Sequence, residues 1–191
     1  MRQDDARFPL VPTLHATLGV QGYRPPVGTW DNKAQVYCSA ALQLVTGQLT
    51  TRLREQPARS KAKTGHRKQQ RLQTAFVAHR GAIARAYPAR RSPEVVSTIA
   101  KAPGHSGAGV AQVLEAHSHR RLSRLPSYSP QLNVIERFWR VLRRRATHNR
   151  LFTRMASVRA TLRNNLSYFQ TMTQKVLSLI ESPRKAKKEA K

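Results

Sequence analysis

Apolar side chains alternate along the stretch from Ala34 to Leu53, on both sides of a Thr46-Gly47 pair. The alternating positions are Val36, Cys38, Ala40 and Leu42 before the pair, and Leu49, Thr51 and Leu53 after it. A period of two residues around a glycine-containing turn predicts a β-hairpin. The preceding segment, Gly19 to Trp30, contains two consecutive prolines, which favours a loop or an edge strand over a central strand.

After the hairpin, the composition becomes polar and basic between Glu55 and Arg71, which predicts a linker or a mobile loop. A helix is predicted next, because apolar residues recur every three or four positions from Leu72 to Tyr87. Pro88 should end this helix, since proline cannot donate the hydrogen bond that a continuing helix requires.

Two short strands and a helix are predicted in the next part of the chain. Val95 to Ile99 is a β-branched run that follows Pro93, and such a run is typical of a buried parallel strand. Arg121 to Leu125 has a weaker strand pattern. Between them, the segment from Ser106 to His117 has its apolar residues on one side and predicts a helix.

The strongest helical pattern begins near Ser129-Pro130, which is suited to an N-cap followed by proline in the first turn. Its apolar stripe consists of Val134, Ile135, Phe138, Trp139, Val141 and Leu142. The segment from Leu151 to Ile180 predicts one long helix or two, and residues 184–191 predict a disordered basic tail. A hairpin followed by alternating strands and helices predicts an α/β domain over residues 1–183.

The composition adds a strong charge signal to this pattern. The chain of 191 residues has 35 Lys and Arg against 9 Asp and Glu, a formal net charge of +26, which favours a polyanionic partner. Hydrophobic residues make up 39% of the chain, enough for a core, so the charge does not predict disorder throughout. A single cysteine excludes an internal disulfide, and we expect a soluble cytoplasmic protein.

With so few carboxylates, each one can be considered as a candidate for chemistry. Asp4 and Asp5 precede Phe8 in a short extended segment, and Glu136 lies on the polar side of the strongest helix. Phosphodiester chemistry with two metal ions requires carboxylates from different elements, which makes Asp4 and Glu136 candidate ligands. The alternatives are a surface pair between Glu136 and Arg140, four residues later, and a solvated chain end around Asp4.

Several phrases of the sequence resemble the DDE transposases of bacterial insertion sequences, which are related to the mariner superfamily. The most specific phrase is Leu125-Pro126-Ser127-Tyr128-Ser129-Pro130-Gln131-Leu132-Asn133-Val134-Ile135-Glu136-Arg137-Phe138-Trp139, and weaker ones are Gln3-Asp4-Asp5-Ala6-Arg7-Phe8, Gly28-Thr29-Trp30 and Ala102-Pro103-Gly104-His105. The resemblance implies a ribonuclease H-like fold, a mixed sheet flanked by helices with a long C-terminal helical segment. It further implies that the domain cuts and joins DNA with Mg²⁺ or Mn²⁺ held by an Asp, Asp, Glu triad.

The resemblance assigns the first catalytic, metal-binding position to Asp4 and the last to Glu136. The middle position departs from the pattern, because Ala100 stands where the family has the second aspartate. Lys101 and Gly104 likewise replace an asparagine and a tryptophan. We expect the triad to be incomplete and this copy to be inactive. The start of the chain just before Asp4 led to the expectation of a truncated copy without its helix-turn-helix DNA-binding domain.

Two functions from different classes remain open at this point. One is a Mg²⁺-dependent DNA endonuclease and strand transferase of DNA transposition and integration; the other is a non-catalytic, basic remnant that binds nucleic acid. A ribosomal or chromatin-type protein fits the charge but not the phrase that ends at Trp139. DNA is the expected partner, with a homodimer or a mixed dimer with an intact transposase as further possibilities. A basic stripe could guide a DNA backbone, or is otherwise a solvated face; it consists of Arg137, Arg140, Arg143, Arg144 and Arg145. The first four are the candidate DNA-binding residues.

Overall fold

A computed structural model describes residues 1–16, 20–22, 26–29, 31–56, 65–90, 95–99, 107–117, 119–126 and 132–180 of the chain. It contains a five-stranded sheet in the order β3-β2-β1-β4-β5. The strands are β1 (Arg2–Pro9), β2 (Gln35–Leu42), β3 (Leu49–Gln56), β4 (Val95–Ile99) and β5 (Arg120–Arg124). The first three pair antiparallel, whereas β4 is parallel to β1 and β5 is parallel to β4. This arrangement confirms the predicted α/β class.

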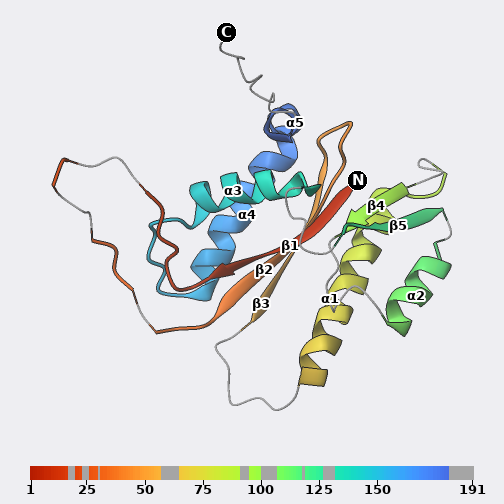
Figure 1. The fold of residues 1–191 in the computed structure, drawn as a ribbon, viewed down its shortest axis with the longest axis horizontal. Helices are drawn as coiled ribbons and strands as arrows, with labels where there is room; N and C mark the ends of the chain where they lie inside the picture. The colour runs from red at the N-terminus through yellow and green to blue at the C-terminus, as the bar shows by residue number, and fades with distance from the viewer. Residues whose placement is uncertain are drawn as a thin grey trace, which may run out of the picture.

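Helices cover both faces of the sheet (Figure 1). They are α1 (Gly65–Ala86), α2 (Ala108–Glu115), α3 (Ile135–Ala146), α4 (Met155–Thr171) and α5 (Thr173–Ile180). The helices α3, α4 and α5 enclose the larger core with β1, β2 and β3, and a smaller cluster joins α1 and α2 to β4. In the described part of the chain, no helix is long and apolar enough to cross a membrane.

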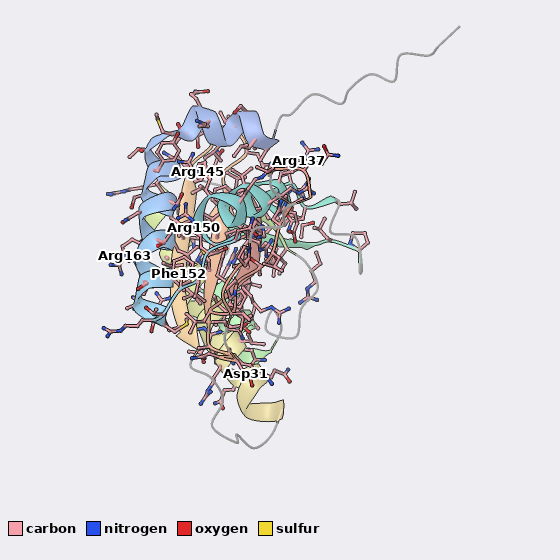
Figure 2. All side chains as sticks on the ribbon, turned by 90° about the vertical axis from the view of Figure 1, so that its left-hand side faces the viewer. Asp31, Arg137, Arg145, Arg150, Phe152 and Arg163 are labelled. Atoms are coloured by element: carbon pink, nitrogen blue, oxygen red, sulfur yellow. The ribbon has the colours of Figure 1, made fainter. Side chains whose placement is uncertain are left out.

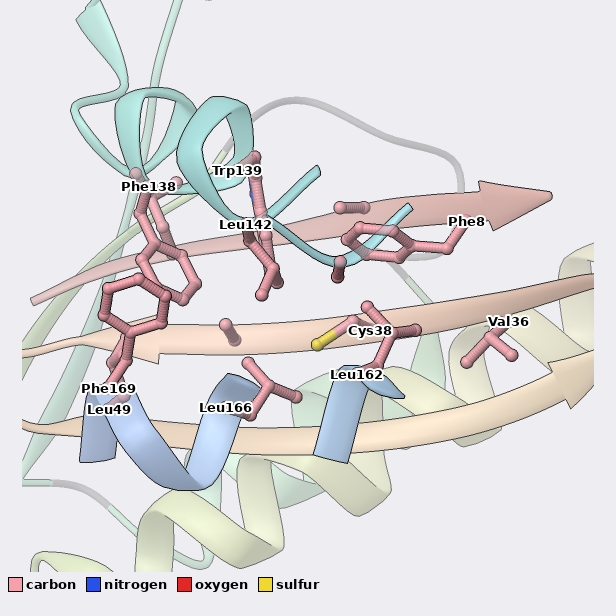
Figure 3. Packing of buried hydrophobic residues seen from close by; sticks show 14 of the residues in the cluster. Phe8, Val36, Cys38, Leu49, Phe138, Trp139, Leu142, Leu162, Leu166 and Phe169 are labelled. Atoms are coloured by element: carbon pink, nitrogen blue, oxygen red, sulfur yellow. The ribbon is translucent and has the colours of Figure 1, made fainter. Parts of the chain in front are cut away.

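The larger core follows from the alternation of side chains along the strands. The same face of the sheet carries Ala6 and Phe8 from β1 and the alternating residues of β2, because Ala6 pairs with Cys38 and Phe8 with Val36. Aromatic rings continue this core into the helices: the ring of Phe138 lies 5.3 Å from the rings of both Trp139 and Phe169 (Figure 3). Residues from β1, α3 and α4 therefore form one packed layer.

The predicted hairpin is confirmed, with β2 and β3 on either side of the expected turn. Gly47 in that turn has a φ of 71°, which favours glycine, and a Cβ there would collide with the carbonyl oxygen of Thr173. The strand Val95–Ile99 has the predicted limits, and β5 begins one residue earlier than predicted. The segment from Leu151 to Ile180 forms two helices, since α4 and α5 are separated at Met172.

Two predicted boundaries are wrong. The segment from Gly65 to Arg71, predicted as linker, belongs to α1, because its Gln, Arg and Lys residues are good helix formers. The helix predicted from Ser129-Pro130 begins at Ile135, where Val134 is the N-cap residue and the amide of Glu136 donates to the carbonyl of Asn133. Residues 127–131 and the predicted tail at 184–191 lie outside the described residues.

Replacing Leu162 by alanine tests the core directly. Leu162 of α4 is fully buried against the sheet, so Leu162→Ala should lower the free energy of unfolding by about 2–5 kcal/mol. Leu14→Ala is the matched control, because Leu14 is 74% exposed and should change stability by less than about 0.5 kcal/mol. Urea denaturation followed by circular dichroism measures both. Equal losses for the two variants would contradict the assignment of Leu162 to the core.

Candidate active site

The first acidic residue of the candidate site lies on the central strand of the sheet. β1 has β2 on one side and β4 on the other, and alternation places Asp4 on the same face as Ala6 and Phe8, under α3. The neighbouring Asp5 is exposed and points to the opposite face. Asp4 is therefore part of a paired strand, and the alternative of a solvated chain end is wrong for this residue.

The second acidic residue is held by the first turn of α3. The apolar stripe of this helix packs on the sheet through Ile135, Phe138, Trp139 and Leu142, all fully buried. Glu136 lies beside that stripe and is partly buried. Its position in the first turn also suits a carboxylate, because the helix dipole is positive at this end.

A hydrogen bond links the core to the acidic pair. The indole Nε1–H of Trp139 donates to Oδ2 of Asp4 at 3.1 Å. The indole itself is fully buried and packs edge-on against Phe8, with ring centroids 6.3 Å apart. Because the ring is fixed by packing on two sides, its N–H restricts the orientation of the Asp4 carboxyl group.

Burial is the main cause of an unusual proton affinity at Asp4. The pKa of Asp4 is raised from 3.8 to about 7, mainly by burial, and the negative charges of Glu136 and Asp5 act in the same direction. Hydrogen bonds from the Asp5 backbone and from Trp139 oppose this change. The Glu136 charge thus acts on Asp4, which places the two carboxyl groups of β1 and α3 in one site.

The surface-pair alternative for Glu136 finds no support in the described residues. No ion pair joins Glu136 to Arg140 in this part of the chain; the pair formed there is Arg159 with Glu55, at 3.1 Å. Arg140 therefore does not neutralise Glu136, and the charge of Glu136 contributes to the raised pKa of Asp4.

The four predicted basic residues of α3 occupy different surroundings. Arg137 donates from its guanidinium to the carbonyl oxygen of Ile180 at 2.8 Å, and so ties α3 to the end of α5. The guanidinium of Arg143 lies 5.7 Å from the ring of Phe8. Arg140 and Arg144 are exposed, and their spacing of four residues puts them on one side of the helix. Only these last two have no packing role among the described residues.

The sequence analysis missed two features of this region. Trp139 was assigned to the apolar stripe alone, and no pattern in the sequence shows that its N–H would reach Asp4. Arg145, the last residue of the predicted basic stripe, stacks over Tyr168, with its guanidinium 4.5 Å from the ring centroid. A repeat of three arginines at the end of α3 indicated charge there but could not identify the one that packs on an aromatic ring.

The donor set fits one divalent cation. Asp4 and Glu136 offer hard carboxylate oxygens from two elements, and a cation would offset both the burial and the mutual repulsion of their charges. Among the described residues, however, no three His, Cys, Asp or Glu side chains gather as a metal site would require. The strand pairing of β1 with β4 ends at Gln3 and Ile99, and the next residue of each segment is Asp4 and Ala100.

The order of the strands and an acidic pair between the central strand and a packed helix define a ribonuclease H-like domain with a partial acidic site. A family model described as "DDE superfamily endonuclease" matches residues 59–159, and the chain belongs to this family. Members of this superfamily use divalent metal ions. A comparison with curated proteins found no match to this sequence.

Solved structures of similar fold include several of the Mos1 transposase. A pre-cleavage Mos1 transpososome matches with a TM-score of 0.62 and 17% identity over 94% of this chain and 53% of that chain. A Mos1 paired-end complex with the left transposon end gives 0.58 and 16%, over 94% and 52%. The Mos1 mariner transposase catalytic domain gives 0.57 and 15%, over 94% and 78%. The chain thus spans about half the length of the longer Mos1 chains, and these likenesses establish the fold.

Asparagine at position 4 should stabilise the fold at neutral pH. A raised carboxyl pKa means that ionised Asp4 destabilises the folded state; this penalty is absent below pH 3.8 and grows as pH rises to about 7. Asp4→Asn removes the charge but keeps an acceptor for Trp139. The variant should therefore gain on the order of 2 kcal/mol at pH 8 and little at pH 4.

Urea denaturation at the two pH values measures this effect. Asp31→Asn is the control, because Asp31 is exposed and its replacement should be neutral at both. A loss of stability for Asp4→Asn at pH 8 would show that the charge of Asp4 has a favourable partner in the metal-free protein.

Proposed function

We propose that this chain is a DDE transposase-type domain that binds DNA but does not cut it. Two observations carry the proposal: the charge of Glu136 acts on Asp4, and the sequence has Ala100, a residue without a ligand atom, where the family has its second aspartate. The family match and the ribonuclease H-like fold support DNA phosphodiesters as the ancestral substrate. The Mos1 structures with a transposon end support DNA as the partner.

Asp4 and Glu136 are the proposed catalytic and metal-binding residues, with Mg²⁺ or Mn²⁺ as the cation. A Mos1 paired-end complex has been solved with Mn, which supports this choice. When bound, paired cations of this kind stabilise the charge on the entering and leaving oxygens of a phosphodiester. In this chain, Trp139 orients Asp4 through its N–H, and α3 brings Glu136 to the same site.

The defect lies in the number of carboxylates. Metal affinity at such sites depends on the count and charge of the oxygen ligands, so two carboxylates should hold one ion weakly and leave a second ion unsupported. Lys101, which follows Ala100 in the sequence, adds a positive charge where the family has a neutral asparagine. Neither residue is among those that the structure describes.

DNA binding is proposed to rest on the basic stripe of α3. Arg140 and Arg144 are the members free to meet a phosphate, whereas Arg137 and Arg143 contact α5 and Phe8. The net charge of +26 should make the affinity depend steeply on salt. In this proposal the chain acts as a non-catalytic DNA-binding domain, alone, with a second copy or with an intact transposase.

Restoring the missing groups tests the assignment of the defect. The chain as given should not nick supercoiled DNA with Mg²⁺ or Mn²⁺, because a single weakly held ion cannot stabilise both oxygens. Combining Ala100→Asp, Lys101→Asn and Gly104→Trp should produce metal-dependent nicking. Adding Glu136→Ala to that variant should abolish the nicking again.

Gel analysis of plasmid nicking, with EDTA as the metal-free control, measures each variant. Cleavage by the unmodified chain that persists in Glu136→Ala would refute both the site and the proposed inactivity. Nicking by the unmodified chain that Glu136→Ala removes would refute the inactivity alone.

The role of α3 in DNA binding has a separate test. For about six phosphate contacts, affinity should fall roughly a thousandfold between 50 and 200 mM salt. Arg140→Gln combined with Arg144→Gln should reduce the slope of log affinity against log salt by about 2, since each removes one phosphate contact. Fluorescence anisotropy on a labelled duplex measures the slope, and Arg85→Gln with Arg90→Gln, both exposed, is the control pair.

A further inference from the structure

A groove of about 600 Å³ lies between β3 and α1, away from the candidate active site. Six residues form most of its lining: Arg52, Leu53 and Arg54 from β3, and Gln70, Arg71 and Thr74 from α1. β3 is an edge strand of the sheet, so one wall of the groove is the rim of the domain. None of these residues belongs to the candidate active site or to the basic stripe of α3.

The strand pairing fixes the direction of the two β3 arginines. Arg52 pairs with Ser39 and Arg54 with Tyr37, so both lie on the face opposite to Cys38 and Ala40. That face is the one covered by α1, whereas Asp4 lies on the other. Two residues apart on a strand, the arginines are spaced by about 7 Å and point the same way.

The described residues that line the groove include three arginines and no carboxylate. Glu55, adjacent to Arg54 in the sequence, pairs with Arg159 of α4. Asp5 lies on the same face as Arg52, beyond Ser39, and the charges of Asp5 and Arg52 both act on the buried His79 of α1. Three guanidinium groups from two elements therefore border one groove, and bringing them together costs repulsion that an anion would offset.

One of these guanidinium groups is held in place. The Arg54 guanidinium stacks 4.7 Å from the ring centroid of Tyr37, and its Nε is buried without a hydrogen-bond partner among the described residues. Stacking limits the conformations that Arg54 would lose on binding, so its remaining donors are prepared for an acceptor.

The lining fits a phosphate backbone better than a nucleobase. Arginine, glutamine and threonine side chains are the usual donors to phosphate oxygens in complexes with DNA. The lining also includes Ala75 and Ala78 of α1, but the ring of Tyr37 is already covered by Arg54 and so is not open to stack on a base. Three arginines along a groove with an open rim suit successive phosphates of one strand.

We propose that the groove between β3 and α1 binds the phosphodiester backbone of a nucleic acid, as a second contact on the face of the sheet opposite to Asp4 and Glu136. This contact is separate from the proposed active site and requires neither divalent metal nor cleavage. It gives the domain two basic surfaces, one at α3 and one at the β3 edge.

The test compares two triple variants of the full chain in EDTA. The groove variant combines Arg52→Gln, Arg54→Gln and Arg71→Gln. The control combines Arg150→Gln, Arg154→Gln and Arg163→Gln, three exposed arginines at and before α4, two of which are labelled in Figure 2. Both lose the same charge. Anisotropy with a labelled DNA duplex and a labelled single strand measures affinity and its salt dependence.

The groove variant should bind at least one of these nucleic acids about tenfold or more weakly at 100 mM salt, and its salt slope should fall by about 2 to 3. The control variant should lose less than about threefold. Equal losses in both variants, or no loss in the groove variant, would overturn the proposal, since bulk charge alone would then account for binding.

Further measurements distinguish the proposal from a folding defect and from a site for a small anion. A groove variant with lysine in place of all three arginines should recover most of the salt slope, and circular dichroism and light scattering should show each variant folded and monodisperse. If pyrophosphate or a mononucleotide displaced DNA at micromolar concentration, the site would be one for a small anion and the proposal would be wrong. Because every measurement is made in EDTA, where no metal-dependent cleavage occurs, a failed nuclease prediction leaves this result independent.

Discussion

The packing of α3 across β1 determines where every acidic group of the candidate site lies. The helix buries four large side chains against the strand, and this fixes both the rotation and the position of its first turn. The position of the first turn determines where Glu136 lies. The indole of Trp139, on the same helix, donates its hydrogen bond to Asp4. A change in this interface would move the two carboxyl groups relative to each other, although neither of them contributes to the core.

That arrangement has an electrostatic consequence. The chain has a net charge of +26, which would favour ionised carboxylates. The pKa of Asp4 is nevertheless raised, because the side chain is buried and the charges that act on it, those of Glu136 and Asp5, are negative. Such a site is unfavourable in the absence of a cation and favourable with one, which is the usual condition of a metal-binding carboxylate pair. Basic side chains gather elsewhere, on the exposed side of α3 and in the groove between β3 and α1.

The parts of the fold with a strong period were predictable from sequence. The hairpin and the strand Val95–Ile99 were predicted correctly because alternation and β-branching reflect burial on a sheet. The start of α1 was missed because its first turns are polar, so that no apolar period reports them. The start of α3 was predicted too early. A Ser-Pro pair is favourable at a helix start, but the residue at which the regular helix begins depends on tertiary packing, which the pair does not reveal.

The candidate site was predictable in its residue types but not in its geometry. The resemblance named Asp4 and Glu136, and the structure brings them together. It could not distinguish Arg140 from Arg137, because a carbonyl of α5 meets only the latter, 43 positions away in the chain. The groove could not be predicted from the sequence for the same reason. Arg54 and Arg71 are separated by a segment without a periodic pattern, and only the packing of α1 against β3 brings them together.

The fold and the chemistry of this domain also depend on different residues. The buried clusters of the described chain use Ile99 at the end of β4 but draw nothing from the acidic pair. A third carboxylate beside Asp4 and Glu136 would add repulsion in the metal-free protein, where burial already raises the pKa of Asp4 to about 7. The fold therefore does not depend on a third carboxylate, and stability alone would not select for one.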